Sequence, residues 1–147
     1  MTSRRLALLI LVLVLSSASV LAQKPTTPKA GSAERKAIMD GLRAGVRDQD
    51  GLAGDIVFKV HKLSVLGPYA LLTVTPVTRD LKEIPAFTDD CMCDCEIIAF
   101  MMRQGAAWRV VERQVDPCDA PWEDFFRSHP RYPIALYHHW QSSPFKP

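Results

Sequence analysis

Apolar and polar residues alternate with a helical period in the first part of this 147-residue chain and with strand-like runs afterwards. Between Ser32 and Asp48 the apolar side chains recur every three or four positions, which predicts one amphipathic helix. Ser32 is a favourable N-cap, and Glu34 in the first turn suits the positive end of the helix dipole. The apolar stripe consists of Ala33, Ala37, Ile38, Leu42 and Val46.

Two glycines interrupt this helix at a spacing of four residues. Gly41 and Gly45 each weaken an isolated helix by up to about 1 kcal/mol relative to alanine. They lie on one side of the helix, so we expect them to let it approach a sheet closely.

Four runs rich in β-branched and apolar residues follow and predict strands. Gly67-Pro68 separates the first two, Pro76 is expected to end the second, and Gln104-Gly105-Ala106 predicts a hairpin turn between the last two. The expected strands are 56–66, 69–75, 96–103 and 108–115. The order predicts an α+β fold, with the N-terminal helix packed on a four-stranded antiparallel meander and a short C-terminal helix over 120–127. Its general shape is cystatin-like or NTF2-like, an analogy of architecture that carries no function.

The two ends of the chain differ from this central part. Residues 1–22 have a basic start, a ten-residue apolar core and a small residue at the exit, which predicts a signal peptide and a periplasmic or secreted product. An apolar run of ten is too short to span a bilayer, so we expect no spanning segment after cleavage. We expect three parts after the signal peptide: a disordered linker over 23–31, one domain over 32–128, and an irregular tail over 129–147, which has four prolines.

Charge excludes one class of partner. The chain has 18 basic and 16 acidic residues, and loss of Arg4 and Arg5 with the signal peptide leaves 16 of each. A neutral protein lacks the basic surface that neutralises phosphates, so nucleic acid is not expected as a partner.

Several local strings resemble a group of small bacterial exported α+β proteins. They are the helix string 35–43, the sheet string 57–65, and the hairpin string from Gly105 to Glu112, which has the form G-x-x-W-R-V-V-E, with Trp122 downstream. The resemblance covers roughly residues 33–125 and implies the fold. That group has no established activity, so the resemblance implies no functional residue, and the cysteines depart from its pattern.

Four cysteines, Cys91, Cys93, Cys95 and Cys118, form the most distinctive feature of the sequence. In an exported small protein they predict two disulfides. If Gly105-Ala106 is the hairpin turn, Cys93 faces Cys118; if Gln104-Gly105 is the turn, Cys91 does. We favour Cys93–Cys118 with Cys91–Cys95.

A metal site is the alternative interpretation of the same cysteines. The C-x-C-x-C spacing in an extended segment puts three sulfurs on one face, and Cys118 could supply a fourth ligand. Such thiolates suit Cu(I) or Zn(II). An oxidising compartment favours disulfides instead, so we expect no cofactor.

Other polar side chains are weaker candidates. His61 and Glu112 could face each other in a pocket as an acid–base pair, although a solvent-facing His61 is the simpler interpretation. The remaining candidates are the acidic Asp89, Asp90 and Asp94 and the His138-His139 pair, which we expect in solvated loops or a mobile tail.

Three functions follow from these patterns. We expect a non-catalytic exported module that binds an unknown protein or small ligand in the cell envelope. The first alternative is a periplasmic copper- or zinc-binding protein that uses residues 91–95, and the second is a small NTF2-like enzyme that uses His61 or Glu112.

Overall fold

A computed structural model describes residues 23–47, 52, 55–88, 91–93, 95–115, 117–118 and 122–142. The predicted signal peptide and the three aspartates 89, 90 and 94 lie outside these residues, so the interpretations that rest on them stay predictions.

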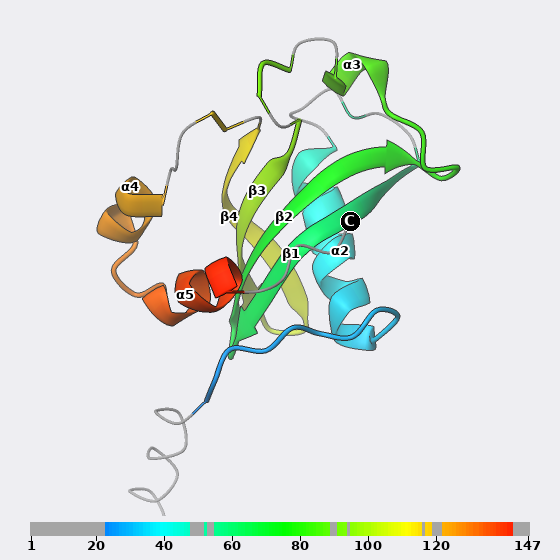
Figure 1. Ribbon diagram of the computed structural model, residues 1–147. Coiled ribbons are helices and arrows are strands. Elements are labelled where there is room, and N and C mark those ends of the chain that lie inside the picture. The colour runs from blue at the N-terminus through cyan, green and yellow to red at the C-terminus, as the bar shows by residue number, and fades with distance from the viewer. Residues whose placement is uncertain are drawn as a thin grey trace, which may run out of the picture.

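The described chain forms an antiparallel sheet with helices on both faces (Figure 1). Its strands lie in the order β1-β2-β3-β4, which is a simple meander. This confirms the predicted α+β fold with a helix packed on a four-stranded sheet. The elements are α2 (Ala33–Val46), β1 (Ile56–Leu66), β2 (Tyr69–Thr78), α3 (Pro85–Thr88), β3 (Ile97–Gln104), β4 (Ala107–Val115), α4 (Trp122–Ser128) and α5 (Ile134–Ser142).

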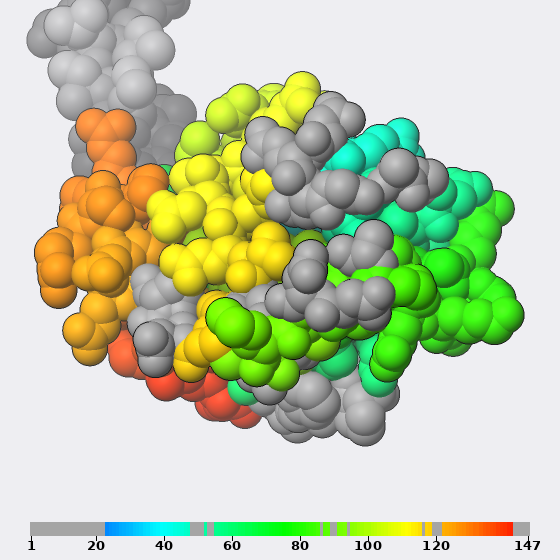
Figure 2. Space-filling model, turned by 90° about the horizontal axis from the view of Figure 1, so that it is seen from above, coloured from blue at the N-terminus to red at the C-terminus, as the bar shows by residue number. Residues whose placement is uncertain are grey.

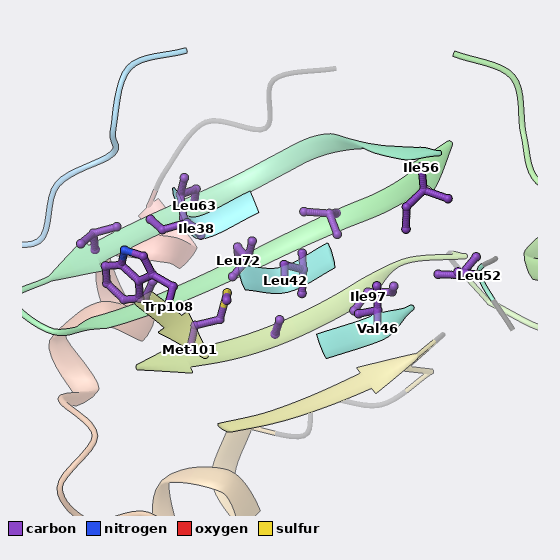
Figure 3. Close-up of a cluster of buried hydrophobic side chains, with 14 of the residues drawn as sticks. Ile38, Leu42, Val46, Leu52, Ile56, Leu63, Leu72, Ile97, Met101 and Trp108 are labelled. Atoms are coloured by element: carbon purple, nitrogen blue, oxygen red, sulfur yellow. The ribbon is translucent and has the colours of Figure 1, made fainter. Parts of the chain in front are cut away.

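Helix α2 covers one face of the sheet with the apolar stripe that its sequence predicts. Ile38, Leu42 and Val46 are fully buried. In Figure 3 they point at sheet residues that include Leu72 and Ile97. Burying an aliphatic side chain of this size contributes roughly 1.5–3 kcal/mol, so this face is the main core of the protein.

Helix α2 lies very close to the outer strand β4 because it has glycine at the points of contact. A Cβ built on Gly41 would lie 2.3 Å from the carbonyl oxygen of Trp108, and one on Gly45 would lie 2.5 Å from a methyl group of Val110. A side chain at Gly41 would push against the backbone of β4, and one at Gly45 would displace the Val110 side chain. Both contacts agree with the close approach expected from the glycine spacing.

Replacing Gly41 with alanine is expected to lower the free energy of unfolding by about 1–2 kcal/mol. The gain of about 1 kcal/mol in helix propensity is outweighed by overpacking, which costs roughly 1–3 kcal/mol and more against backbone. Urea denaturation followed by circular dichroism measures the change. Ala44, which is exposed on the same helix, provides the control: Ala44→Gly should cost about 1 kcal/mol through propensity alone. A Gly41→Ala protein that is more stable than the parent would contradict the close contact.

The opposite face of the sheet is covered by α4 and α5, which form a second core. Seen from the end of the sheet, α2 (cyan) and α4 (orange) lie on opposite sides of β4 (yellow) (Figure 2). The second core consists of Leu71, Ile98, Phe100, Trp122, Phe125, Tyr132 and Leu136. The prediction of an irregular tail over 129–147 is therefore wrong for the described part that forms α5, because Leu136 is fully buried there.

Tyr132 ties this second layer to the sheet. Its buried hydroxyl accepts a hydrogen bond from the amide of Met101 at 2.9 Å and donates to the carbonyl oxygen of Ala70. Ala70 and Met101 face each other on β2 and β3. Burial raises the pKa of Tyr132, so the hydroxyl keeps its proton. A hydrogen-bonded tyrosine thus fixes the segment between α4 and α5 against two strands.

Strand β2 continues through Pro76, where the sequence predicted that it would end. Pro76 pairs with Phe58 of β1, and β2 ends at Thr78. The pairing of β2 with β3 reaches only to Val74 and Ile97. At Pro76 the β3 side of β2 has no ladder, so the missing N–H group costs no hydrogen bond of the β2–β3 pairing there.

The segment before α2 is also ordered, so the prediction of a disordered linker over 23–31 is wrong. Thr26 exchanges two backbone hydrogen bonds with Val65, of 2.9 and 2.8 Å. The Thr27 hydroxyl donates to the carbonyl oxygen of Leu63 at 3.0 Å, and Pro28 is buried. This segment covers part of the outer edge of β1 and so protects an otherwise open strand edge.

Candidate functional site

A cleft of about 540 Å³ lies between the first half of α2 and the start of β1. Its floor is apolar: Ile56 is 4% exposed, and Met39 is half-buried and packs against the main core. Charged side chains form the walls. The lining consists of Ala30, Gly31, Arg35, Lys36, Met39, Asp40, Arg43, Asp55, Ile56, Val57 and Arg79.

Local sequence explains how α2 builds one wall of this cleft. Arg35, Met39 and Arg43 are spaced by four residues and therefore share a helix face. The helix begins where Ser32 accepts a hydrogen bond from the backbone N–H of Arg35 at 3.2 Å. Gly31 has a φ of 78°, a left-handed conformation that glycine adopts without strain, and it turns the chain into the helix.

Three charged residues of α2 form a connected ion-pair group on the wall. The Asp40 carboxylate accepts hydrogen bonds from Lys36 at 2.7 Å and from Arg43 at 2.8 Å. The hydrogen bond from Lys36 is the main cause that lowers the pKa of Asp40. Arg43 also donates to the carbonyl oxygen of Ile56 at 3.0 Å, and its guanidinium lies 5.8 Å from the ring centre of Phe58. Arg43 thus serves the structure by joining α2 to β1.

The remaining charges of the cleft are arranged unevenly. Arg79 and Asp55 form an exposed ion pair of 3.0 Å on the strand side. On the helix side, Arg35 donates one hydrogen bond to the carbonyl oxygen of Pro28 at 3.3 Å. Within the part of the chain that the structure describes, no carboxylate forms an ion pair with Arg35. In total, the lining holds four cationic side chains and two carboxylates. The two carboxylates pair with the other three cations, so Arg35 is the cation that a ligand can pair with.

His61 does not line this cleft, and its side chain is buried in the fold. It is 8% exposed, which shows that the expectation of a solvent-facing side chain is wrong. A β-bulge at this point of β1 leaves His61 out of the pairing register. Its Nε2 lies 2.8 Å from the hydroxyl of Thr75 and 3.4 Å from a carboxylate oxygen of Glu96. Burial, and then the charge of Lys59, lowers the pKa of His61.

The predicted pairing of His61 with Glu112 is wrong. Glu112 lies on β4, and its carboxylate is 3.7 Å from Nδ1 of His129. His61 lies on β1, and two further strands separate the two positions. At about 4.8 Å between neighbouring strands, the separation across the sheet is about 14 Å, too far for a shared proton. Glu112 instead lines a smaller hollow of about 310 Å³ between α2 and β4.

All four cysteines are joined in two disulfides, Cys91–Cys95 and Cys93–Cys118. These are the pairs that the hairpin register favoured. The metal alternative requires thiolates at these positions, whereas the structure holds the sulfurs in S–S bonds. No cluster of three metal-ligating side chains occurs among the described residues.

Sequence reasoning missed a hydroxyl–imidazole pair on the face covered by α5. The Ser64 hydroxyl lies 2.7 Å from Nδ1 of His139, the distance of a nucleophile and its base. Ser64 is fully buried, however, so no substrate reaches it. One residue further along α5, the indole N–H of Trp140 donates to the hydroxyl of Thr73 at 3.2 Å. These contacts fasten α5 to the sheet, and the expectation of a mobile tail at His138-His139 is wrong.

The comparisons with known proteins give no family for this chain. It matches no protein-family model, and neither a curated protein nor a solved structure is significantly similar to it. The likeness to small bacterial exported proteins stays a prediction. Among the described residues, no helix has the length and apolar character needed to cross a membrane.

Proposed function

We propose that this protein is an exported, disulfide-bonded module that binds a small ligand in the cleft between α2 and β1, without catalysing a reaction. The cleft itself carries the proposal. It combines an apolar floor with charged side chains on its walls, and its volume of about 540 Å³ is in the range of small-ligand sites.

The acid–base residues support binding over catalysis because each one is engaged elsewhere. His61 is buried against Thr75 and Glu96, Glu112 faces His129, and Ser64 is buried beneath α5. None of them lines the cleft. A ligand in the cleft meets guanidinium, ammonium and carboxylate groups, most of them held in ion pairs. Such groups can bind and orient a ligand.

The disulfides support an oxidising compartment. Such bonds form and persist in exported proteins and are rare in the cytosol. With the predicted signal peptide, they favour the periplasm or the outside of the cell. The partner is then a small molecule or an exposed group of another protein in the cell envelope.

Amide chemical shifts of ¹⁵N-labelled protein test the proposed site. Octanoate, octanol and octylamine serve as probes, and we expect at least one of them to shift the amides of Gly31, Met39 and Val57 in a saturable way. Ala30 is exposed at the rim, so Ala30→Trp should block the cleft and abolish the shifts. Ala44→Trp, in the smaller hollow, is the matched control and should leave them unchanged. If all three probes leave the cleft amides unmoved, the proposed site is wrong.

A further inference from the structure

We infer that the ligand of this cleft is an organic anion with an apolar chain, whose carboxylate binds Arg35 and whose chain lies on Met39 and Ile56. This rests on the proposed function and adds the chemical class of the ligand.

The charges of the cleft select an anion. Asp40 engages both Lys36 and Arg43, at 2.7 and 2.8 Å, and Asp55 engages Arg79 at 3.0 Å. The guanidinium of Arg35 has five donors, of which the structure uses one, toward the carbonyl oxygen of Pro28. An incoming cation meets carboxylates whose charge is already balanced by a bound cation, whereas an anion meets a guanidinium that no carboxylate neutralises among the described residues.

The geometry of the guanidinium favours a carboxylate. A planar fork of N–H donors matches the two oxygens of a carboxylate and forms charge-assisted hydrogen bonds with them. Hydrogen bonding to Pro28 also holds the Arg35 side chain at the rim, which reduces the entropy lost on binding.

The floor of the cleft requires an apolar group beside that carboxylate. Met39 is half-buried, and Ile56 continues the same surface into the core. Met39 is flexible and polarisable, so it adapts to a hydrocarbon chain. A simple anion such as acetate or phosphate would leave this surface in contact with water and lose the hydrophobic part of the binding energy.

Competition among matched probes tests the inference. Octanoate below its micelle concentration should bind more tightly than octanol, octylamine, acetate or inorganic phosphate, as measured by the cleft amides. Arg35→Gln should weaken octanoate binding about tenfold, the usual effect of losing a charge-assisted hydrogen bond. Arg35→Lys keeps the charge and should retain more of the binding. Added salt should weaken octanoate binding and leave octanol unaffected.

Arg47→Gln is the control, because it removes the same charge just after the same helix at an exposed residue outside the cleft lining. It should leave the octanoate affinity unchanged, and thermal melts establish that each variant folds. Equal or tighter binding of octanol, octylamine or phosphate at the cleft would overturn the inferred ligand class and leave the site itself standing. An Arg35→Gln protein that binds octanoate as well as the parent would also overturn it.

Discussion

Phe125→Ala is expected to lower the free energy of unfolding by about 3–5 kcal/mol, the usual cost of removing a buried aromatic ring. Phe125 is 1% exposed and stacks on Phe100, with ring centres 3.4 Å apart and planes 15° apart. It also meets the edge of Tyr132 at 4.9 Å. Its removal leaves a cavity at the centre of the second core, between α4 and the sheet.

Chemical denaturation followed by circular dichroism and tryptophan fluorescence measures this loss, and two of the three tryptophans, Trp122 and Trp140, lie on α4 and α5. Phe126→Ala is the matched control, because Phe126 is the next residue of the same helix and is only half-buried. It should cost clearly less. Equal losses for the two variants, or a fluorescence transition that precedes loss of the sheet signal, would show that α4 is not part of the cooperative fold.

The sequence predicted the first core well because its signals are local. The helical stripe of α2 and the bounds of β1 follow from periodicity within single segments, and β1 was predicted at the residues that it occupies. The second core was predicted in part: the short helix expected over 120–127 is present as α4. Helix α5 was missed because it is short and follows Pro130 and Pro133, residues that indicate irregular chain. Leu136, Tyr137 and Trp140 provided a helical spacing that could have revealed it.

The candidate cleft could not be predicted, because separate segments of the chain build it. The four-residue spacing of Arg35, Met39 and Arg43 is visible in the sequence. The cleft also needs Asp55, just before β1, and Arg79, just after β2, and the spacing does not reveal them. The proposed His61–Glu112 pair failed for a related reason. Both residues lie in strands, and only the strand order shows that they belong to opposite edges of the sheet.

The cysteine pairing could be predicted from the sequence, because the position of the hairpin turn determines which residues of β3 and β4 face each other, even far from the turn. Gln104 faces Ala107, as the favoured turn requires. A bulge after Phe100 then shifts the register by one residue, so that Ile97 faces Val115. The loops beyond the strands absorb this shift, and the Cα atoms of Cys93 and Cys118 are 5.5 Å apart. The bulged ladder alone would miss this pair by one position, and the loop backbone makes up the difference.

Removing the Cys93–Cys118 disulfide by replacing both cysteines with alanine is expected to lower the free energy of unfolding by about 3.5 kcal/mol. In the chain-entropy account a cross-link stabilises by restricting the unfolded chain, and the effect grows with loop length. This bond spans 25 positions, whereas Cys91–Cys95 spans four. The paired replacement Cys91→Ala with Cys95→Ala is therefore the matched control, with an expected loss of about 2 kcal/mol.

Urea denaturation of the parent and the two double variants measures both losses, and thiol titration of the unfolded parent should find no free thiol. The difference between the two variants is the informative quantity, because each loses two sulfurs from the same region and only loop length distinguishes them. Equal losses would mean that the long bond does not hold the open end of the β3–β4 hairpin. Four titratable thiols with one bound copper or zinc would contradict the disulfides and restore the metal-binding alternative, since thiolates and S–S bonds are exclusive states of the same four sulfurs.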